Sequence, residues 1–590
     1  SVNCLYECLS KNRKCSCIRN VSKYERGLTG KLSECLPYTI GKQSIAFFSM
    51  EIGLDGGIPT YSGGLGILAG DTVRSSADLK LPLVAVTLVS RKGYFRQELT
   101  SDGWQIEHPD EWDPSKFMTP LPAEVKVQIQ RRDVKVKAWL YEVKSLVGGA
   151  IPVLFLDTDV EGNTPEDRAI TNNLYGDDGI YRLKQEVVLG VGGVRILDAL
   201  GFQIRRYHMN EGHSSLLALE LLRKYGMDVE RVRNLCIFTT HTPVDAAHDK
   251  FSYDLVREVL DDFIPLDTLK KLGGQDLLNM TRLALNLSEY INGVSKKYQL
   301  TSSRLFPGYQ INAITNGVHS YTWTSEPFRK LFDKYIPGWA NEPELLVRVD
   351  TIPNEEVWEA HQDAKKTLID FVNETTKVGM DYNTLTIGFA RRATGYKRAT
   401  LIFSDLDKLR KISRKGRIQL IFAGKAHPRD ESGKRLIKEI FGYIATLKDK
   451  IKIVYLPNYN MSTAFKLIPG SDVWLNTPLP PLEASGTSGM KAAHNGVLNF
   501  SVLDGWWIEG WIEGVTGWAI GPLPEEEVSE PERRARELED LYNKLEYVIV
   551  PMYYQRRDEW IEMMKNSIGK IAYYFNSHRM MRRYITEAYF

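Results

Sequence analysis

Short apolar runs that alternate with helical patterns are the feature that most constrains this fold. In the first half, such runs occupy residues 45–50, 83–89, 151–156, 204–209, 235–240 and 311–314. Helical patterns at 183–197 and 214–225 lie between them. Because buried strands that alternate with helices form parallel sheets with crossover helices, this pattern predicts an α/β fold.

A second series of apolar runs begins near residue 385. Its members occupy residues 385–390, 418–423, 451–456, 472–476 and 497–502. They recur about every 30 residues or less, the spacing of βαβ units, and a helical pattern at 432–447 fills one interval. The chain is therefore predicted to form two Rossmann-like, doubly wound lobes. Ligands of such folds lie beyond the carboxyl ends of strands, so we expect the active site in the cleft between the lobes.

The two series divide the chain into four predicted parts. One α/β lobe takes residues 1–330, a helical linker region takes 331–380, and a second α/β lobe takes 381–545. Residues 546–590 are predicted to be a helical tail that packs back on the lobes. Apolar residues of this tail recur at helical spacing: Trp560, Met563, Met564, Ile568 and Ile571.

The composition is that of a soluble globular protein, with 43% hydrophobic and 25% charged residues. The 76 Lys and Arg against 74 Asp and Glu give a net charge of +2, which provides no reason to expect nucleic acid as a partner. No apolar run reaches the roughly 18 residues of a membrane helix, and no signal-peptide core precedes the first strand. We expect a cytoplasmic protein without a membrane partner.

Five of the six cysteines lie near the N-terminus: Cys4, Cys8, Cys15, Cys17 and Cys35. Their spacing does not match paired zinc knuckles, so free thiols, disulfides and a metal site all stay open for them. The sixth, Cys236, lies in an apolar run, and we expect it in the core. No metal is expected at the active site.

A glycine-rich segment at residues 62–69 is the first candidate site. Its glycines would let backbone N–H groups approach a ligand, and the following residues could supply a helix N-terminus that attracts anions. The match to the G-x-G-x-x-A dinucleotide fingerprint is weak, because no hydrophobic strand directly precedes it. A tight turn without a ligand remains the alternative.

Residues 482–491, Leu-Glu-Ala-Ser-Gly-Thr-Ser-Gly-Met-Lys, form the most informative segment. They follow the apolar run at 472–476 and a proline-rich turn. Small residues expose the backbone, hydroxyl groups are available, and Lys491 ends the segment. This chemistry suits an oxygen-rich ligand beside an amine, although spacing alone leaves a structural loop open.

This segment resembles the pyridoxal-phosphate signature of the α-glucan phosphorylases, in which Glu-Ala-Ser-Gly-Thr precedes the cofactor lysine by three residues. Lys491 falls at that lysine position. Other segments similar to family motifs follow in family order, at residues 48–51, 63–68, 182–186, 239–242, 315–317, 391–398, 424–426 and 457–459. By this resemblance the chain is identified as a member of the family, similar to its short bacterial and archaeal forms.

The resemblance implies a two-lobed GT-B fold and phosphorolysis of α-1,4-glucan, such as glycogen or maltodextrin, at the non-reducing end. Inorganic phosphate would be the second substrate, and α-D-glucose 1-phosphate would form with retention. Lys491 would hold pyridoxal 5'-phosphate, whose phosphate would relay protons. Family members are commonly dimers, so a homodimer is expected. The short N-terminal region implies that allosteric regulation is lacking.

The resemblance also implies residue roles. Arg392 would bind substrate phosphate and Lys397 would lie between the two phosphates, while Arg391, Thr487 and Ser488 would contact the cofactor phosphate. The backbone of Gly63, Gly64 and Leu65 would face substrate phosphate. Sugar contacts would come from His241, Tyr396, Glu483, Ala484, Ser485 and Gly486. Catalysis would thus depend on Lys491, Arg392, Lys397 and His241.

Two other functions are open alternatives. A nucleotide-sugar glycosyltransferase on the same fold, similar to glycogen synthase, would need no cofactor lysine, so Lys491 argues against it. A non-catalytic glucan-binding protein would not need the intact set of Arg392, Lys397, Glu483 and Lys491. Taken alone, His241 is more often structural, and the tryptophans at 506, 507, 511 and 518 are more often core than sugar platforms.

Overall fold

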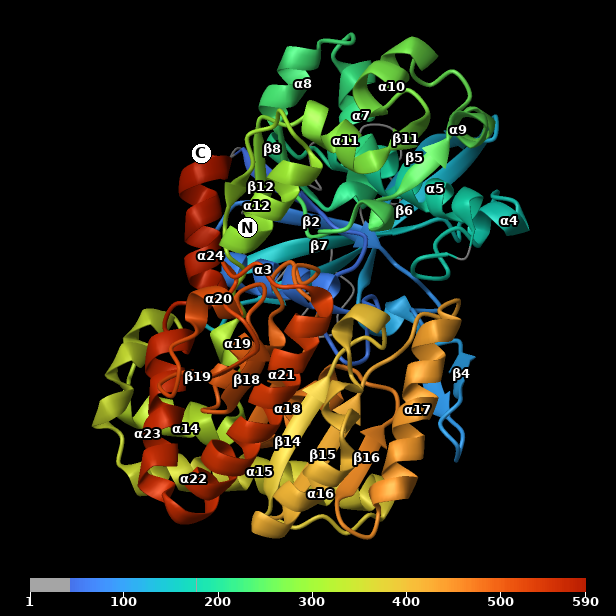
Figure 1. The fold of residues 1–590 in the computed structure, drawn as a ribbon. Coiled ribbons are helices and arrows are strands. Elements are labelled where there is room, and N and C mark those ends of the chain that lie inside the picture. Colours follow the sequence, from blue (N-terminus) through green and yellow to red (C-terminus); the bar gives the residue numbers. More distant parts are fainter. Residues whose placement is uncertain (1–42, 177) are drawn as a thin grey trace.

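Two sheets rich in parallel strands dominate the computed structural model (Figure 1). The structure describes residues 43–176 and 178–590, so the cysteines at positions 4–35 lie outside the described residues. Within these described ranges, the larger sheet has nine strands in the order β13-β12-β9-β8-β1-β2-β7-β6-β5, and the smaller has six in the order β16-β15-β14-β17-β18-β19. The predicted α/β fold is confirmed.

The first sheet is parallel through its centre and antiparallel at one edge. Its parallel strands are β1 (Ser44–Phe48), β2 (Leu83–Leu88), β7 (Ala150–Asp157), β8 (Ile204–Asn210), β9 (Cys236–Thr239), β12 (Tyr290–Gly293) and β13 (Asn312–Ala313). The antiparallel strands β5 (Thr119–Ile129) and β6 (Arg132–Lys144) extend it. Every residue of β1 and β2 is buried, as expected for strands covered on both faces. Cys236 is buried, as predicted.

Helices alternate with the strands of this sheet along the chain. They are α3 (Gly64–Asp78), α4 (Pro165–Arg168), α5 (Gly179–Val187), α6 (Gly193–Ala199), α7 (Leu216–Lys224), α8 (Val229–Leu235), α9 (Tyr253–Leu260), α10 (Leu266–Gly273), α11 (Met280–Asn286), α12 (Lys296–Leu305) and α13 (Ser320–Trp323). The helix expected at 183–197 is interrupted by a π-helical turn at Val188–Gly192. Two small antiparallel pairs accompany the sheet. One is the hairpin of β3 (Arg96–Leu99) and β4 (Gln105–His108), and the other joins β10 (Lys250–Ser252) to β11 (Leu277–Asn279), which α9 and α10 separate along the chain.

The second sheet is parallel throughout. Its strands are β14 (Leu385–Ala390), β15 (Ile418–Ala423), β16 (Lys452–Leu456), β17 (Val473–Asn476), β18 (Leu498–Val502) and β19 (Gly517–Ile520). Numbered along the chain, their spatial order is 3-2-1-4-5-6, that of the Rossmann fold. The accompanying helices are α16 (Leu406–Lys415), α17 (Glu431–Leu447), α18 (Met461–Gly470), α19 (Ser488–Ala493), α20 (Trp507–Gly510) and α21 (Glu530–Lys544).

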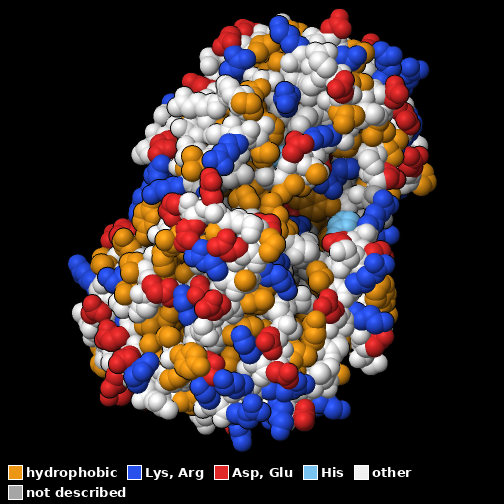
Figure 2. All heavy atoms as spheres, in the orientation of Figure 1, with side chains coloured by type: hydrophobic (Ala, Val, Ile, Leu, Met, Phe, Trp, Pro, Cys, Tyr) orange, Lys and Arg blue, Asp and Glu red, His pale blue; other side chains and the backbone are white. Residues whose placement is uncertain are grey.

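The segment between the sheets is helical, with α14 (Glu326–Tyr335) and α15 (Asn354–Thr376). Apolar side chains of both helices, among them Phe328 and Val357, belong to the hydrophobic core around the second sheet. The β3–β4 hairpin reaches the same sheet, because Gln105 hydrogen-bonds both the backbone carbonyl and the backbone N–H of Ala426. Figure 2 shows the surface hollowed between the two parts of the molecule.

The C-terminal helices α22 (Val550–Gln555), α23 (Arg557–Ser567) and α24 (Ser577–Tyr584) connect the two cores. Trp560 packs in the core of the second sheet, whereas Met580, Tyr584 and Tyr589 pack in a core of the first sheet with side chains of β1. The Tyr589 hydroxyl lies 2.7 Å from Nδ1 of His208 on β8. The residue limits of the four predicted parts stay a prediction. Among the described residues, none of the helices is long and apolar enough to cross a membrane.

Candidate active site

The strand order of the second sheet reverses between β14 and β17, and the candidate cations gather there. Arg391 and Arg392 follow β14, and the segment that contains Glu483 and Lys491 follows β17. Because β14 and β17 are parallel neighbours, both segments leave the same edge of the sheet. Crevices at such reversals are where open α/β sheets bind ligands.

Glu483 binds two of the cations. Its Oε2 lies 2.6 Å from Lys397 Nζ and also accepts a hydrogen bond from Arg391. Burial acts to raise the pKa of the Glu483 carboxyl, but Arg391 and Lys397 hold it below its usual range. The structure therefore brings these three predicted site residues together as a charged cluster. Sequence reasoning missed this pairing, since it assigned Arg391 to the cofactor and Glu483 to the sugar.

Lys491 is a buried amine on α19, the short helix that begins at Ser488. Its Nζ lies 4.0 Å from the centre of the Trp323 ring and makes no ion pair with any described residue. Burial lowers the pKa of Lys491 to about 8. An amine with such a pKa is partly neutral near physiological pH, which is the nucleophilic form.

Ser488 links this helix to the cation cluster. Its Oγ accepts hydrogen bonds from Arg391 Nη1 at 3.3 Å and from Trp474 Nε1 at 2.9 Å. Thr487 stands just before the helix and is half-buried. Of the four residues predicted to hold the cofactor, Arg391 and Ser488 are thus in contact, while Thr487 and Lys491 lie on either side of Ser488 in the sequence at the start of α19.

Arg392 is not one of the ion-pair partners of Glu483. It is solvent-accessible, and no described carboxylate forms an ion pair with it. Desolvation by the surrounding protein acts to lower the pKa of its guanidinium, but Tyr396, Tyr94 and Glu51 raise it above the usual value. Glu51, which contributes to this rise, follows β1 of the first sheet.

The glycine loop is held by Glu51. The Glu51 carboxylate accepts hydrogen bonds from the backbone N–H of Gly63 at 3.2 Å and Gly66 at 2.9 Å, and from the Ser62 hydroxyl at 2.8 Å. Among the described residues, the N–H groups of Gly64 and Leu65 have no partner. They stand at the first turn of the 15-residue helix α3, where unpaired N–H groups and the helix dipole attract anions. The predicted helix N-terminus after the loop is confirmed.

His241 follows β9 and is fixed by two side chains from the end of β8. Its Nε2 lies 2.8 Å from Asn210 Oδ1, and its backbone N–H donates to Glu211 Oε2 at 2.8 Å. Burial lowers the pKa of His241 to about 4, so the ring is neutral at physiological pH. Glu211 has a φ of 72°, a conformation that non-glycine residues seldom adopt.

Tyr298 and Ser295 bring the His241 segment next to residues 483–486. The Tyr298 hydroxyl lies 2.9 Å from Thr240 Oγ1, and its ring packs against Ala484. Ser295 Oγ donates to the Ala484 carbonyl at 2.6 Å. Ser485 and Gly486 directly follow Ala484, and the Tyr396 ring centre lies 4.5 Å from Lys397 Nζ, which pairs with Glu483. Three of the tryptophans, 506, 507 and 518, are buried in the core.

Sequence reasoning missed three acidic residues at this site. Glu51 holds the glycine loop, Glu211 holds His241, and Asp504 accepts the Glu483 backbone N–H at 3.0 Å. Burial raises the pKa of Asp504 to about 7. Each of the three follows closely behind the carboxyl end of a parallel strand, β1, β8 or β18, and this position is the signal that could have found them.

The second sheet has the Rossmann strand order, and cationic side chains gather at its switch point, the place where the strand order reverses. The first sheet carries a glycine loop at a helix N-terminus. Both features are typical of two-sheet α/β proteins that bind anionic ligands. A family model described as carbohydrate phosphorylase matches residues 266–543. The maltodextrin phosphorylase of Thermococcus litoralis is 41% identical over 94% of this chain and 71% of its own length. The glycogen phosphorylase of Aquifex aeolicus is 37% identical over 93% of this chain and 86% of its own.

The glycogen phosphorylase of Mycobacterium tuberculosis is 36% identical over 92% of this chain and 70% of its own length. The chain belongs to the carbohydrate phosphorylase family. The resemblance stated from the sequence motifs is thereby confirmed, and the mixed α/β architecture agrees with the GT-B type of fold that it implied.

Proposed function

We propose that this protein cleaves the terminal α-1,4 bond of a glucan with inorganic phosphate and releases α-D-glucose 1-phosphate with retention. Two observations carry the proposal: Arg392 is accessible and has no ion pair with a described carboxylate, and the N–H groups of Gly64 and Leu65 have no described partner at the start of α3. Relatives named maltodextrin phosphorylase and glycogen phosphorylase support it. Glycogen and maltodextrin are the proposed classes of glucan.

Substrate phosphate would bind between Arg392 and the start of α3. A guanidinium can hold two phosphate oxygens at once, and backbone N–H groups at a helix N-terminus complement the remaining charge. In the reaction a phosphate oxygen donates a proton to the glycosidic oxygen and the C1–O bond breaks. Another phosphate oxygen then bonds to C1 from the same face, which retains the configuration. Lys397 would stabilise the charge that builds up.

The residues around Lys491 fit pyridoxal 5'-phosphate. The Lys491 amine is buried, free of any described ion pair and partly neutral at physiological pH. Arg391, Thr487 and Ser488 supply one cation and two hydroxyl groups for a phosphate beside it. When bound, the cofactor supplies a phosphate that gains and loses protons near neutral pH. Lys491 would hold it covalently, and Arg391 would orient its phosphate.

The sugar would lie between the Glu483 segment and His241. Both ion pairs of Glu483 involve Oε2, which leaves Oε1 for a sugar hydroxyl. The backbone of Ala484, Ser485 and Gly486 and the Tyr396 hydroxyl offer further polar groups. His241 is neutral and fixed by Asn210 and Glu211, so it can position the sugar without adding charge.

The decisive experiment is a paired measurement on the purified protein. Borohydride treatment should trap pyridoxal phosphate on Lys491, and maltodextrin with phosphate should then release glucose 1-phosphate from untreated protein. Transfer from a nucleotide sugar without any trapped cofactor would instead favour a glycosyltransferase. Trapped cofactor with glucan binding but no phosphorolysis would favour a non-catalytic binding protein.

We extend the proposal to organisation and assembly. The chain would be organised as an N-terminal lobe (1–330), a linker region (331–380), a C-terminal lobe (381–545) and a tail (546–590). It would form a homodimer in the cytoplasm and lack allosteric regulation. Light scattering tests for the dimer through the molar mass in solution. The rate of phosphorolysis with and without nucleotide effectors tests for allosteric regulation.

A further inference from the structure

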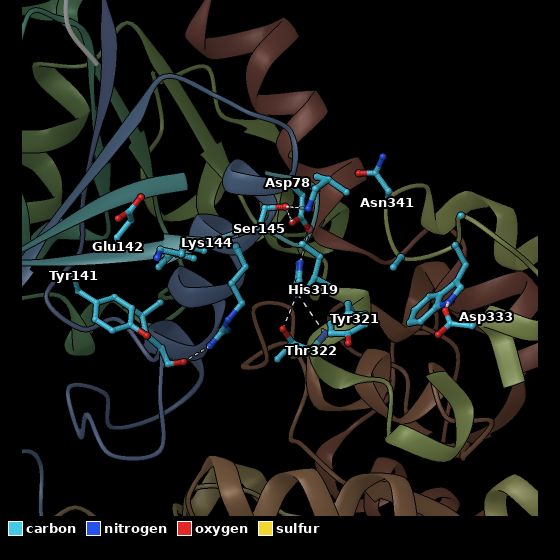
Figure 3. A pocket seen from close by; sticks show the side chains of 18 residues that line it. Asp78, Tyr141, Glu142, Lys144, Ser145, His319, Tyr321, Thr322, Asp333 and Asn341 are labelled. Carbon is cyan, nitrogen blue, oxygen red and sulfur yellow. Dashed lines mark hydrogen bonds and ion pairs between the residues drawn. The ribbon is translucent and has the colours of Figure 1, made fainter. Parts of the chain in front are cut away.

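Outside the active site, two histidines and an aspartate from three distant segments meet at one point, and Figure 3 shows two of them, Asp78 and His319. Asp78 ends α3, His319 directly precedes α13, and His578 lies on α24. Asp78 Oδ2 lies 2.7 Å from His319 Nε2 and 3.3 Å from His578 Nε2. All three potential ligand atoms lie within 4.8 Å of one another.

His578 gives the cluster an unsatisfied atom. The side chain is 0% exposed, yet its Nε2 forms no hydrogen bond with any described residue despite the nearby Asp78 carboxylate. Buried polar atoms almost always have a partner, because the loss of water is otherwise uncompensated. His578 Nε2 is aimed at the same carboxylate oxygen that His319 contacts. A ligand between the three residues would satisfy it.

In each of the three residues, the polar atom that faces away from the cluster contacts a hydroxyl group. Ser75 Oγ lies 3.0 Å from Nδ1 of His578, Thr322 Oγ1 lies 2.6 Å from Nδ1 of His319, and Ser145 Oγ donates to Asp78 Oδ1 at 2.5 Å. In metal sites, such outer partners fix the ring orientation and the tautomer of the ligating histidines. The backbone N–H of Thr322 donates to Nδ1 of His319 at 3.4 Å, so without a metal the His319 proton lies on Nε2, where it bonds Asp78 Oδ2. A metal ion would replace that proton, which would move to Nδ1, where the Thr322 hydroxyl can accept it.

A cavity of about 550 Å³ adjoins the cluster and is lined by Asp78, Ser145, His319 and Thr322 among others. Figure 3 shows Asp78, Ser145 and His319 gathered at one side of it. The cavity also contacts Arg74, whose guanidinium pairs with Asp71 at 3.0 Å. It gives the cluster room for one further small ligand, such as a water molecule or an anion.

We propose that Asp78 Oδ2, His319 Nε2 and His578 Nε2 bind one divalent transition-metal ion, for which Zn²⁺ is the best fit. Zinc bonds of about 2.0 to 2.2 Å at tetrahedral angles separate neighbouring ligand atoms by roughly 3.3 Å. The Asp78–His578 separation already has this value, and the Asp78–His319 separation needs only a small widening. A ligand from the cavity fills the fourth position. This site is independent of the proposed phosphorolysis.

The metal would join the C-terminal tail to the helix that starts at the glycine loop. Asp78 and Gly64 are the two ends of α3, so a bond from Asp78 to His578 fixes the far end of that helix on α24. The backbone N–H of His319 donates to Asp71 Oδ2 at 3.1 Å in the middle of α3, and Trp323 Nε1 donates to the same oxygen at 2.8 Å. We therefore assign the ion a structural role.

The test uses the full chain after removal of metal with a chelator. On addition of Co²⁺, the wild-type protein should show the intense visible bands of a tetrahedral nitrogen–oxygen site, and Zn²⁺ should displace them and raise the melting temperature. Because the N-terminal cysteines are also potential zinc ligands, the bound equivalents are compared between wild type and His578→Gln. The variant should bind one equivalent less and lose the thermal shift.

Two further variants complete the design. Ser145→Ala should weaken metal binding by about tenfold, since it removes an outer partner and leaves all three ligands. His108→Gln is the matched control, because His108 pairs with Glu98 at the surface and should bind as wild type does. The proposal is overturned if wild-type protein shows no tetrahedral cobalt spectrum, or if His578→Gln retains the same equivalents and thermal shift.

Discussion

The glycine loop of the first sheet and the switch point of the second sheet present donors to an anion in two different ways. At the loop, the Glu51 carboxylate accepts hydrogen bonds from uncharged backbone N–H groups, whose positions are set by α3. At the switch point, the Glu483 carboxylate accepts hydrogen bonds from two charged side chains, Arg391 and Lys397. Backbone donors are fixed in place, whereas side-chain cations can turn from the carboxylate to a ligand. The glycine loop would therefore fix the position of a bound anion, and the cations of the switch point would neutralise its charge.

Loss of Lys491 tests the switch point most severely. In Lys491→Ala, both cofactor retention and phosphorolysis should fall to background, because no other group can replace the covalent attachment. Absorbance after borohydride and release of glucose 1-phosphate measure the two effects.

Lys425→Ala is the matched control for cofactor retention. Burial lowers the pKa of Lys425 to about 8 as well, but its Nζ donates to the Phe95 carbonyl rather than standing free. This variant should keep the cofactor. Full activity of Lys491→Ala would contradict the assignment.

Arg392 should set the use of phosphate. We expect Arg392→Ala to lower kcat/KM for phosphate by about 100-fold, the size of effect when one strong donor to a transition-state anion is removed. The cofactor should stay bound and glucan affinity should be unchanged. Arg392→Lys should recover only part of the loss, since a lysine cannot bind two oxygens in parallel. If Arg392→Ala weakened the use of phosphate and the binding of glucan equally, Arg392 would not be the phosphate-binding residue.

Two glycine substitutions separate the stability of the glycine loop from its role in binding phosphate. A Cβ at Gly66 would lie 2.6 Å from Glu51 Oε1 and 2.7 Å from Tyr61 Cβ, so Gly66→Ala should destabilise the protein by about 1–3 kcal/mol. A Cβ at Gly64 would meet nothing within 4 Å. Gly64→Ala should therefore keep its stability but raise KM for phosphate. Urea unfolding and phosphate titration measure both, and equal stability of the two variants would argue against the role of Glu51.

The smallest effect concerns pH. Because the pKa of His241 falls from its ordinary 6.5 to about 4 on folding, the unfolded chain binds the proton first as pH falls. Stability should therefore decrease as pH falls from about 6.5 to about 4, and by about 1 kcal/mol at pH 5.5 for this residue. In His241→Asn the decrease should be shallower by that amount. Thermal unfolding at pH 7.5 and 5.5 measures this loss of stability. An equal loss in wild type and His241→Asn would show that folding does not lower the pKa of His241.

The sequence predicts the strands well where both faces are buried. β14 and β15 match the expected runs at 385–390 and 418–423 at both ends. The antiparallel strands β5 and β6 were not predicted. Prolines interrupt β5, and along β6 buried residues alternate with more exposed ones from Val134 to Leu140, so neither strand has a continuous apolar run. An edge strand with one wetted face does not show the continuous apolar run of a central parallel strand.

The predicted site residues are brought together, but their pairing was beyond sequence reasoning. Arg391 and Glu483 are separated by 92 positions, and their contact depends on β14 lying next to β17. Nothing local in the sequence fixes that order. The cofactor lysine was found because a family motif marks it, whereas Glu51 and Glu211 lie outside the motif residues assigned to the site. Residue roles at the site remain predictions until the variants are measured.

The tail that packs on the first sheet has a consequence for how the chain folds during synthesis. Tyr584 and Tyr589 fill the same core as Ile45 and Phe47, although more than five hundred positions separate them. While the ribosome is still adding the second sheet, β1 and α3 lack these covering side chains. The apolar side chains of β1 that Tyr584 and Tyr589 cover therefore stay exposed until α24 has been made, which favours aggregation of the growing chain at this face.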